Sequence, residues 1–235
     1  MTNGRSPRLA VLIDADNTSA RVAEGLFLEI AKLGEASVRR IYGDFADARM
    51  RGWAEALPRH AIVPQQNFAY TTGKNSADIA LVIDAMDLLH SGRFDGFCLV
   101  SSDSDFTRLA ARVREQGLDA FGFGQRKTPE AFRQACKRFF FTENLMPAPP
   151  EGDPAAARKE SPAAALALLT TAVEEIEEDD GWVALAALGN QLQKIAPDFD
   201  SRTYGSPKLS TLIEKTGRFE LDRAAKTIRL RLRPA

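Results

Sequence analysis

The fold of this chain is decided by residues 8–17, RLAVLIDADN, in which an unbroken apolar run ends on Asp14, Asp16 and Asn17. A short apolar run without polar–apolar alternation is typical of a β-strand that is covered on both faces. Residues 19–34 follow as an amphipathic helix. The apolar side chains of this helix recur at helical spacing, at Val22, Leu26, Ile30 and Leu33. A buried strand followed directly by a helix is the start of a βαβ unit.

The alternation of strand and helix continues to residue 141. Further strands are expected at residues 36–43, 61–65, 94–105 with the acids at its end, 118–124 and 138–141. Further helices are expected at residues 46–57, 76–92, 105–117 and 128–136. In the helix over 76–92, the side chains expected to face the core are Ile79, Val82, Ile83, Met86 and Leu89. This alternation favours a parallel sheet between two helical layers, so residues 1–145 are expected to form an α/β three-layer sandwich.

A second pattern begins after a stretch rich in Pro and Ala. Residues 146–161 contain no aromatic side chain and are expected to be a linker. The elements expected after it are helices at 162–178, 185–195 and 206–216, a short strand at Trp182 and Val183, and two strands joined by a basic turn within 219–233. Three helices and a β-hairpin are the elements of a winged-helix domain. We therefore expect a small α+β winged-helix domain over residues 162–235.

The overall composition points to a soluble, reduced, cytoplasmic protein. Hydrophobic residues make up 44% and charged residues 27%, and no apolar run approaches the roughly 18 residues of a membrane span. The first residues show no secretion signal, and no membrane partner is expected. Cys98 and Cys136 lie in apolar surroundings and are expected to be reduced core thiols. Two Cys and two His are too few for a zinc site.

The net charge of −1 conceals an uneven distribution. Residues 1–145 carry 19 Lys and Arg against 18 Asp and Glu, and residues 146–181 carry 2 against 9. Residues 182–235 carry 10 against 5, an excess of +5. A basic C-terminal segment is consistent with a polyanionic partner. A solvated basic face would explain the same excess.

Acidic residues gather where the strands of an open parallel sheet end. Asp14 follows the first strand, Asp103 and Asp105 follow the strand that begins at residue 94, and Asp78 lies in the first turn of the helix over 76–92. Strands one and four are neighbours if the strand order reverses between them, which would bring these acids together.

Clustered carboxylates repel one another unless a cation binds between them. Ligands that are all oxygen select a hard ion, Mg²⁺ or Mn²⁺, which can hold a phosphate and activate water. The alternative is that Asp78 and Asp105 only cap helices or form turns. Asp14 has no such structural reason to stand at the end of an apolar strand.

Three separated motifs resemble the signatures of the NYN family, a group of PIN-like ribonucleases. These are VLIDADNTS at 11–19, GKNSADIALVIDAM at 73–86 and LVSSDSDFTRLAARVREQG at 99–117, and the likeness covers residues 8–145. The resemblance implies a PIN-like fold, metal-dependent RNA cleavage, and a catalytic, metal-binding cluster of Asp14, Asp78, Asp103 and Asp105. It also implies that Asn17 accompanies the first acid and that Lys74 and Ser102 contact phosphate or order the site. Asp84 lies on another side of its helix and is not included.

Residues 182–221 resemble the OST-HTH/LOTUS pattern. The residues that fit its frame are Phe199, Tyr204, Gly205, Lys208, Leu209 and Leu212. The candidate RNA contacts are Lys208, Lys215, Arg218, and Arg223, Lys226 and Arg229 in the wing. Similar modules bind RNA or proteins, so the resemblance implies recognition of RNA, expected to be single-stranded, or of a protein partner.

Three other functions are alternatives to the ribonuclease. IDADNT, residues 13–18, also resembles the motif of haloacid-dehalogenase-type phosphatases, with Asp14 as nucleophile and Asp16 as acid. That family needs a further Ser- or Thr-ended strand and a lysine between its acidic motifs, and Lys74 is poorly placed for this role. A dinucleotide-binding fold would need a Gly-x-Gly-x-x-Gly turn, which is missing after the first strand. In a regulatory RNA- or protein-binding scaffold, the acid cluster would be degenerate or purely structural.

Overall fold

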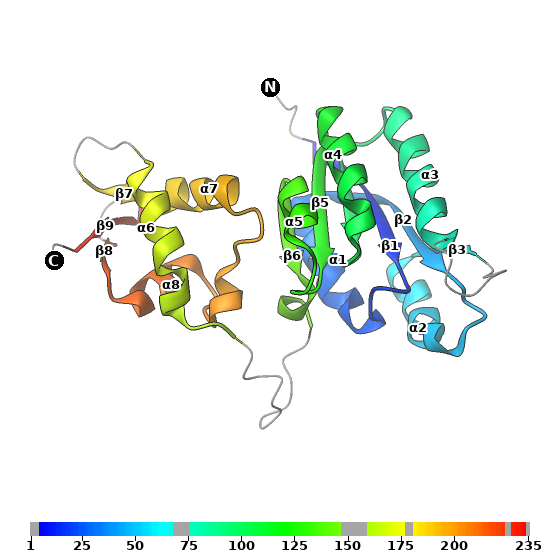
Figure 1. Cartoon of the computed structure of the whole chain (residues 1–235), viewed down its shortest axis with the longest axis horizontal. Coiled ribbons are helices and arrows are strands. Elements are labelled where there is room, and N and C mark those ends of the chain that lie inside the picture. Colours follow the sequence, from blue (N-terminus) through cyan, green and yellow to red (C-terminus); the bar gives the residue numbers. More distant parts are fainter. Residues whose placement is uncertain (1–4, 68–75, 147–158, 177–180, 224–226, 234–235) are drawn as a thin grey trace. The chain divides into compact units, whose positions relative to one another are not determined.

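The computed structural model describes residues 5–67, 76–146, 159–176, 181–223 and 227–233. The chain divides into two compact units, Met1–Pro147 and Ala148–Ala235, which are drawn in Figure 1. Lys74 and Lys226, two of the predicted binding residues, lie outside the described residues.

The first unit is built on a six-stranded sheet with the order β3-β2-β1-β4-β5-β6. All of its neighbouring strands run parallel. The strands are β1 (Arg8–Asp14), β2 (Glu35–Gly43), β3 (Val63–Gln66), β4 (Gly96–Val100), β5 (Asp119–Gly124) and β6 (Arg138–Phe141). The order reverses between β1 and β4, and the predicted adjacency of the first and fourth strands is confirmed. Ligands of open α/β sheets bind beyond the carboxyl ends of the strands at such a reversal.

Helices cover both faces of this sheet, as Figure 1 shows. One face packs on α1 (Ala23–Leu33) and α2 (Arg51–His60), and the other on α3 (Ser76–His90), α4 (Thr107–Glu115) and α5 (Glu130–Ala135). Short 3₁₀ turns connect the elements: η1 (Ala20–Val22), η2 (Ala48–Met50), η3 (Ser104–Phe106) and η4 (Thr142–Asn144). In β1, Leu9, Val11 and Ile13 pack on the first face, and Ala10 and Leu12 on the second. The predicted α/β sandwich with a parallel sheet is confirmed.

The inward face predicted for α3 is wrong in part. Ile79 and Ile83 are 61% and 57% exposed. The buried residues of α3 are Ala77, Leu81, Ala85, Leu88 and Leu89. Alanine has no side-chain atom beyond Cβ, so a stripe that includes Ala77 and Ala85 lets the helix approach the sheet closely. The helical spacing of the large apolar side chains alone does not predict this stripe.

Two expectations from composition can be compared with the structure. Cys98 and Cys136 are buried free thiols, as predicted. Burial raises the pKa of the Cys136 thiol to about 12, so this thiol stays protonated at neutral pH. None of the helices in the described part of the chain is long and apolar enough to span a membrane.

The second unit has the elements of a winged helix. They are η6 (Pro162–Ala165), α6 (Leu166–Glu174), β7 (Val183–Ala184), α7 (Leu185–Ile195), η7 (Ser201–Tyr204), α8 (Leu209–Thr216), β8 (Phe219–Asp222) and β9 (Arg229–Leu232). The strands form an antiparallel sheet with the order β7-β9-β8. The apolar faces of the three α-helices and of the sheet share one core. Helix α8 begins at Leu209 and not at 206, because Gly205 takes a left-handed conformation and Lys208 is extended.

Candidate functional site

Asp14 is the central acid of the carboxyl edge of the sheet. The residue is 1% exposed, although it is the last residue of β1. Oδ1 accepts hydrogen bonds from the backbone N–H groups of Asp16 (3.1 Å) and Asn17 (3.2 Å). Oδ2 accepts from Asn17 Nδ2 (2.8 Å) and Ser101 Oγ (2.6 Å). Asn17 therefore contacts both oxygens of the first acid.

These contacts hold the Asp14 carboxylate in one orientation. Burial, in contrast, destabilises its negatively charged form. Burial raises the pKa of Asp14 above its ordinary value, and the hydrogen bonds from Ser101 and Asn17 oppose this rise. The negative charge of Asp16 raises it further. The Asp14 carboxylate thus has a fixed geometry and a negative charge that a nearby cation would stabilise.

Ser101 is a site residue that the sequence reasoning missed. Its buried hydroxyl donates to Asp14 Oδ2 at 2.6 Å and accepts from the backbone N–H of Asp103 at 3.0 Å. It therefore ties the acid after β1 to the acid after β4. The signal lay in the register: Ile13 pairs with Val100, so the residue after Val100 lies beside Asp14.

The two acids after β4 have different local roles. Asp103 caps η3, because one of its carboxylate oxygens accepts the backbone N–H of Asp105 at 2.9 Å. Asp105 lies in the first turn of η3 and is exposed. The sequence had offered capping as the alternative role of Asp105, and the structure gives that role to Asp103.

The other predicted acids act on the charge of Asp78. It stands in the first turn of α3, and its pKa is raised to about 6. Partial burial is the largest cause, followed by the negative charges of Asp14, Asp103, Asp105 and Asp16. Carboxylates from β1, α3 and the β4 turn therefore share one negative field. No three Asp, Glu, His or Cys side chains of the described residues are close enough together to surround a metal ion by themselves.

The remaining predicted residues of this unit fall into two groups. Ser102 accepts the backbone N–H of Gln125 at 2.8 Å and so joins the loop after β5 to the acidic turn. Asp84 accepts from Arg40 Nη1 and from the hydroxyl of Tyr42, both at 2.7 Å. This pairing gives Asp84 a structural role on α3, apart from the converging acids.

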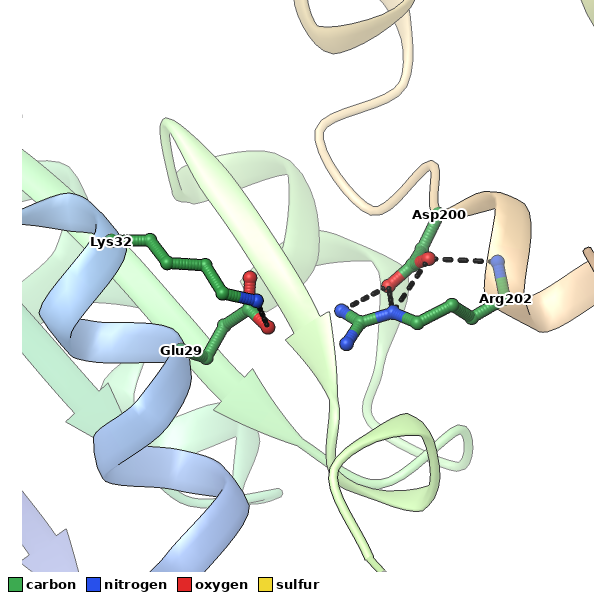
Figure 2. Close-up of polar contacts among 4 residues, drawn as sticks. All are labelled: Glu29, Lys32, Asp200 and Arg202. Carbon is green, nitrogen blue, oxygen red and sulfur yellow. Dashed lines mark hydrogen bonds and ion pairs between the residues drawn. The ribbon is translucent and has the colours of Figure 1, made fainter. Parts of the chain in front are cut away.

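Four basic side chains of the second unit pair with acids of the same unit. Arg202 pairs with Asp200, which also caps η7 (Figure 2), and Arg223 pairs with Glu214. In the wing, Arg229 pairs with Asp222 at 3.0 Å and Arg231 with Glu220 at 2.7 Å.

The predicted RNA-contacting residues therefore differ in how accessible their positive charges are to a ligand. Lys215 donates to the carbonyl oxygen of Gly205 at 3.0 Å, and Arg223 and Arg229 are held by acids. Lys208 and Arg218 are exposed and make no ion pair with the residues that the structure describes. Among the predicted RNA contacts, these two cations at the ends of α8 are accessible to a polyanion.

A Ser101→Ala variant tests the bridge between the two acids. We expect a loss of about 1.5–3 kcal/mol in the free energy of unfolding, because a buried carboxylate loses a donor. Urea unfolding measures this loss, and Ser104→Ala, which removes an exposed hydroxyl from η3, is the matched control. Ser101→Thr keeps the hydroxyl and should recover most of the stability. Equal stability of the Ser101→Ala and Ser104→Ala variants would show that the bridge contributes nothing.

The chain has distant likenesses among solved structures. No curated protein is similar enough to this chain to count as a match. A protein of unknown function from Vibrio parahaemolyticus RIMD 2210633 is 17% identical, with a TM-score of 0.51 over 59% of this chain and 94% of its own. An uncharacterized protein from Nitrosomonas europaea is 32% identical over 38% of this chain and 88% of its own, with a TM-score of 0.29. The first likeness shows the fold alone, and the second TM-score is too low to support a structural argument.

Two family models account for both units. The NYN domain matches residues 8–143, and the OST-HTH/LOTUS domain matches residues 159–227. The first match spans more than half of the chain and indicates a nuclease-type hydrolase, and the second indicates an RNA-binding module. The chain therefore belongs to the NYN domain family, with an OST-HTH/LOTUS domain after its NYN domain.

Proposed function

We propose that this protein is a metal-dependent ribonuclease that hydrolyses phosphodiester bonds of single-stranded RNA. The observation that carries the proposal is the negative charge that Asp14, Asp103 and Asp105 direct at Asp78 at the carboxyl edge of the sheet. Partial burial first, and these charges second, raise the pKa of Asp78 to about 6. The catalytic domain would comprise residues 1–145. A linker over 146–161 would join it to the recognition module of residues 162–235.

The chemistry of the four carboxylates fits a hard divalent cation, Mg²⁺ or Mn²⁺. All their ligand atoms are oxygens, and their mutual repulsion would fall on cation binding. Mg²⁺ keeps several of its waters and commonly takes only one or two carboxylates, so it does not need three protein ligands around it. When bound, such an ion would stabilise charge on the phosphate and lower the pKa of a water molecule.

The protein's own groups would orient this site. Ser101 and Asn17 fix both oxygens of Asp14, and the cap at η3 fixes one oxygen of Asp103. Asp78 and Asp105 would complete the negative surface from α3 and η3. Ser102, and Lys74 from the loop before α3, would contact the phosphate of the substrate.

Recognition of RNA would rest on the second unit. Lys208 and Arg218 are its accessible cations at α8, and Lys215 and Lys226 would assist them. A protein ligand of the same module is the alternative partner, and the truncation argued in the Discussion separates the two.

An Asp16→Asn variant distinguishes the proposed ribonuclease from a phosphatase that would use the same residues after β1. Asp16 is exposed, and its backbone N–H donates to Asp14. In the ribonuclease it has no chemical role, so Asp16→Asn should cleave labelled RNA with Mn²⁺ at a rate within about tenfold of the wild-type protein. In the phosphatase it would protonate the leaving group, and its loss would abolish hydrolysis of a phosphomonoester such as p-nitrophenyl phosphate.

Both substrates are measured with the wild-type protein, Asp14→Asn and Asp16→Asn. Cleavage of RNA by the wild-type protein that EDTA stops and Mn²⁺ restores supports the proposal. Hydrolysis of the phosphomonoester alone, lost equally in Asp14→Asn and Asp16→Asn, would replace the ribonuclease by the phosphatase. Absence of any hydrolysis with Mg²⁺ or Mn²⁺ would favour a binding scaffold.

A further inference from the structure

The position of helix α3 decides how close Asp78 lies to the other acids. Asp78 is in the first turn of α3, whereas Asp14 ends β1 and Asp103 lies in the turn after β4. The helix packs on the sheet through an apolar stripe that includes Leu81 and Ala85. Apolar contacts are non-directional, so they hold a helix against a sheet without fixing its position along its own axis. Directional contacts are needed for that.

Asp84 makes such contacts from the middle of α3. Its Oδ2 atom accepts hydrogen bonds from Arg40 Nη1 and from the hydroxyl of Tyr42, both at 2.7 Å. The two donors are two residues apart on β2 and therefore point to the same face of the sheet, where the ring of Tyr42 packs in one core with α3. Tyr42 is buried, and the side chains of Arg40 and Asp84 are partly buried. We call these three residues the β2–α3 link.

The hydroxyl of Tyr42 is a lasting donor in this link. Burial, and next its hydrogen bond to Asp84, raise the pKa of Tyr42, so the hydroxyl stays protonated. Hydrogen bonds to a carboxylate are stronger than those between neutral groups, and Asp84 accepts two of them at one oxygen. The link therefore ties α3 to β2 at a defined point.

Tyr42 also contacts the strand of the first acid. In the register of β1 with β2, Tyr42 is the partner of Asp14. The carbonyl oxygen of Tyr42 accepts the backbone N–H of Ala15 at 3.0 Å. The backbone of Tyr42 thus holds the strand end that carries Asp14, and its side chain holds the helix that carries Asp78. One residue connects two of the acids.

We propose that Tyr42 and Asp84 are positioning residues that set the distance between Asp78 and the other acids. The inference rests on the proposed ribonuclease function and extends it to residues that hold no metal themselves. Asp84 follows Asp78 by six residues, about 9 Å along the helix axis, so a shift of the helix at Asp84 also moves Asp78. Without the link, only the apolar stripe would set this position. Loss of groups that orient metal ligands typically weakens metal binding by about tenfold to a hundredfold.

The test compares Tyr42→Phe and Asp84→Ala with the wild-type protein. Phenylalanine keeps the ring at residue 42 and removes only the donor, and alanine at residue 84 removes the acceptor. Asp84→Asn is the conservative variant: it loses the same charge as Asp84→Ala but keeps an acceptor oxygen. Ile30→Val removes a buried methyl group from α1, on the other face of the sheet, and is the control for a general loss of stability.

Binding of Mn²⁺ to the full chain is measured without RNA, from the electron paramagnetic resonance signal of the free ion. We expect the dissociation constant to rise about tenfold in Tyr42→Phe and Asp84→Ala, and to stay within about threefold of the wild-type value in Asp84→Asn and Ile30→Val. A variant that is only less stable would bind less Mn²⁺ because less of it is folded, but its folded fraction would keep the same dissociation constant. Cleavage of labelled RNA should fall at half-saturating Mn²⁺ and recover largely at saturating Mn²⁺.

The position of α3 is measured separately, without metal, as the distance between spin labels at Ile79→Cys and Ser104→Cys. Both residues are exposed, and the native thiols of Cys98 and Cys136 are buried and free. Ile79 is next to Asp78 on α3, and Ser104 lies in η3 after β4. We expect a single narrow distance distribution in the wild-type background and in the stability control. The distribution should shift or broaden when the donor or the acceptor of the link is removed.

A Mn²⁺ dissociation constant of Tyr42→Phe and Asp84→Ala equal to that of Ile30→Val would overturn the inference. So would a weaker affinity with an unchanged label distance, since the effect would then not pass through α3. If the wild-type protein does not cleave RNA, the ribonuclease proposal fails. The label distances then still decide whether Tyr42 and Asp84 set the position of α3.

Discussion

An Asp14→Asn variant should cleave RNA at least about a hundredfold to a thousandfold more slowly than the wild-type protein, and an Asp103→Asn variant should do the same. Groups that act on developing charge in a water-poor site contribute on this scale. Asp14 is 1% exposed and stands on β1, and Asp103 stands on the turn after the neighbouring strand β4. Each substitution removes one negative charge from the edge that would hold the cation. Single-turnover cleavage of labelled RNA with Mn²⁺ measures the loss.

Both variants should remain folded. In Asp14→Asn, the hydroxyl of Ser101 can rotate and the amide of Asn17 can turn, so that each accepts where it now donates. In Asp103→Asn, asparagine caps η3 about as well as aspartate does. We therefore expect thermal unfolding midpoints without metal that equal or exceed that of the wild-type protein, because each variant relieves repulsion in the acidic cluster.

Asp87→Asn is the control for both. Asp87 is exposed on α3 and lies nine residues after Asp78, about 13 Å along the helix axis. The same loss of charge at Asp87 should leave cleavage unchanged. A variant of Asp14 or Asp103 that keeps near-normal turnover would show that the proposed metal site is wrong.

The sequence was sufficient to predict the framework of the site. An apolar run that ends on Asp14, a second one that ends before Asp103, and helices between them fix a parallel sheet with acids at one edge. The adjacency of these two strands then follows from the reversal of strand order, which the structure confirms. Asp78 follows because it opens a helix at the same edge.

Features that depend on partners distant in the sequence could not be predicted in this way. Ser101 became recognisable only through its pairing with a strand 87 positions earlier. The inward face of α3 depends on how closely Ala77 and Ala85 let the helix approach the sheet, and the exposed Ile79 gives no hint of this. Arg229 is one of the predicted RNA contacts, and its cross-strand pairing with Asp222 cannot be predicted from charge counts.

Deletion of residues 151–235 should weaken binding of single-stranded RNA by about tenfold to a hundredfold. The first unit has its own two apolar cores, so it should remain folded without the second. Its acids repel the RNA backbone, and a tethered RNA-binding module would raise the local concentration of substrate. The salt slope should fall by about 1.5 to 2 if two or three phosphate contacts are lost. Fluorescence anisotropy in EDTA measures both quantities.

Two full-length variants show which cations carry this effect. Lys208→Glu with Arg218→Glu removes the accessible cations at α8 and should reproduce most of the loss. Arg223→Gln is the control, because its guanidinium is already paired with Glu214 at 2.7 Å and has less charge to offer to RNA. Its affinity should stay within about threefold of the wild-type protein.

The chemical step should survive the deletion. Every acid of the proposed site lies in the first unit, so a short RNA at saturating concentration should be cleaved by the truncated protein at a rate within about threefold of the full chain. A fall in affinity without a fall in this rate assigns binding to the module and chemistry to the sheet edge. If affinity and salt slope are instead the same with and without residues 151–235, the module contributes no phosphate contacts. Its accessible cations Lys208 and Arg218 would then serve to dock a protein partner with an acidic surface.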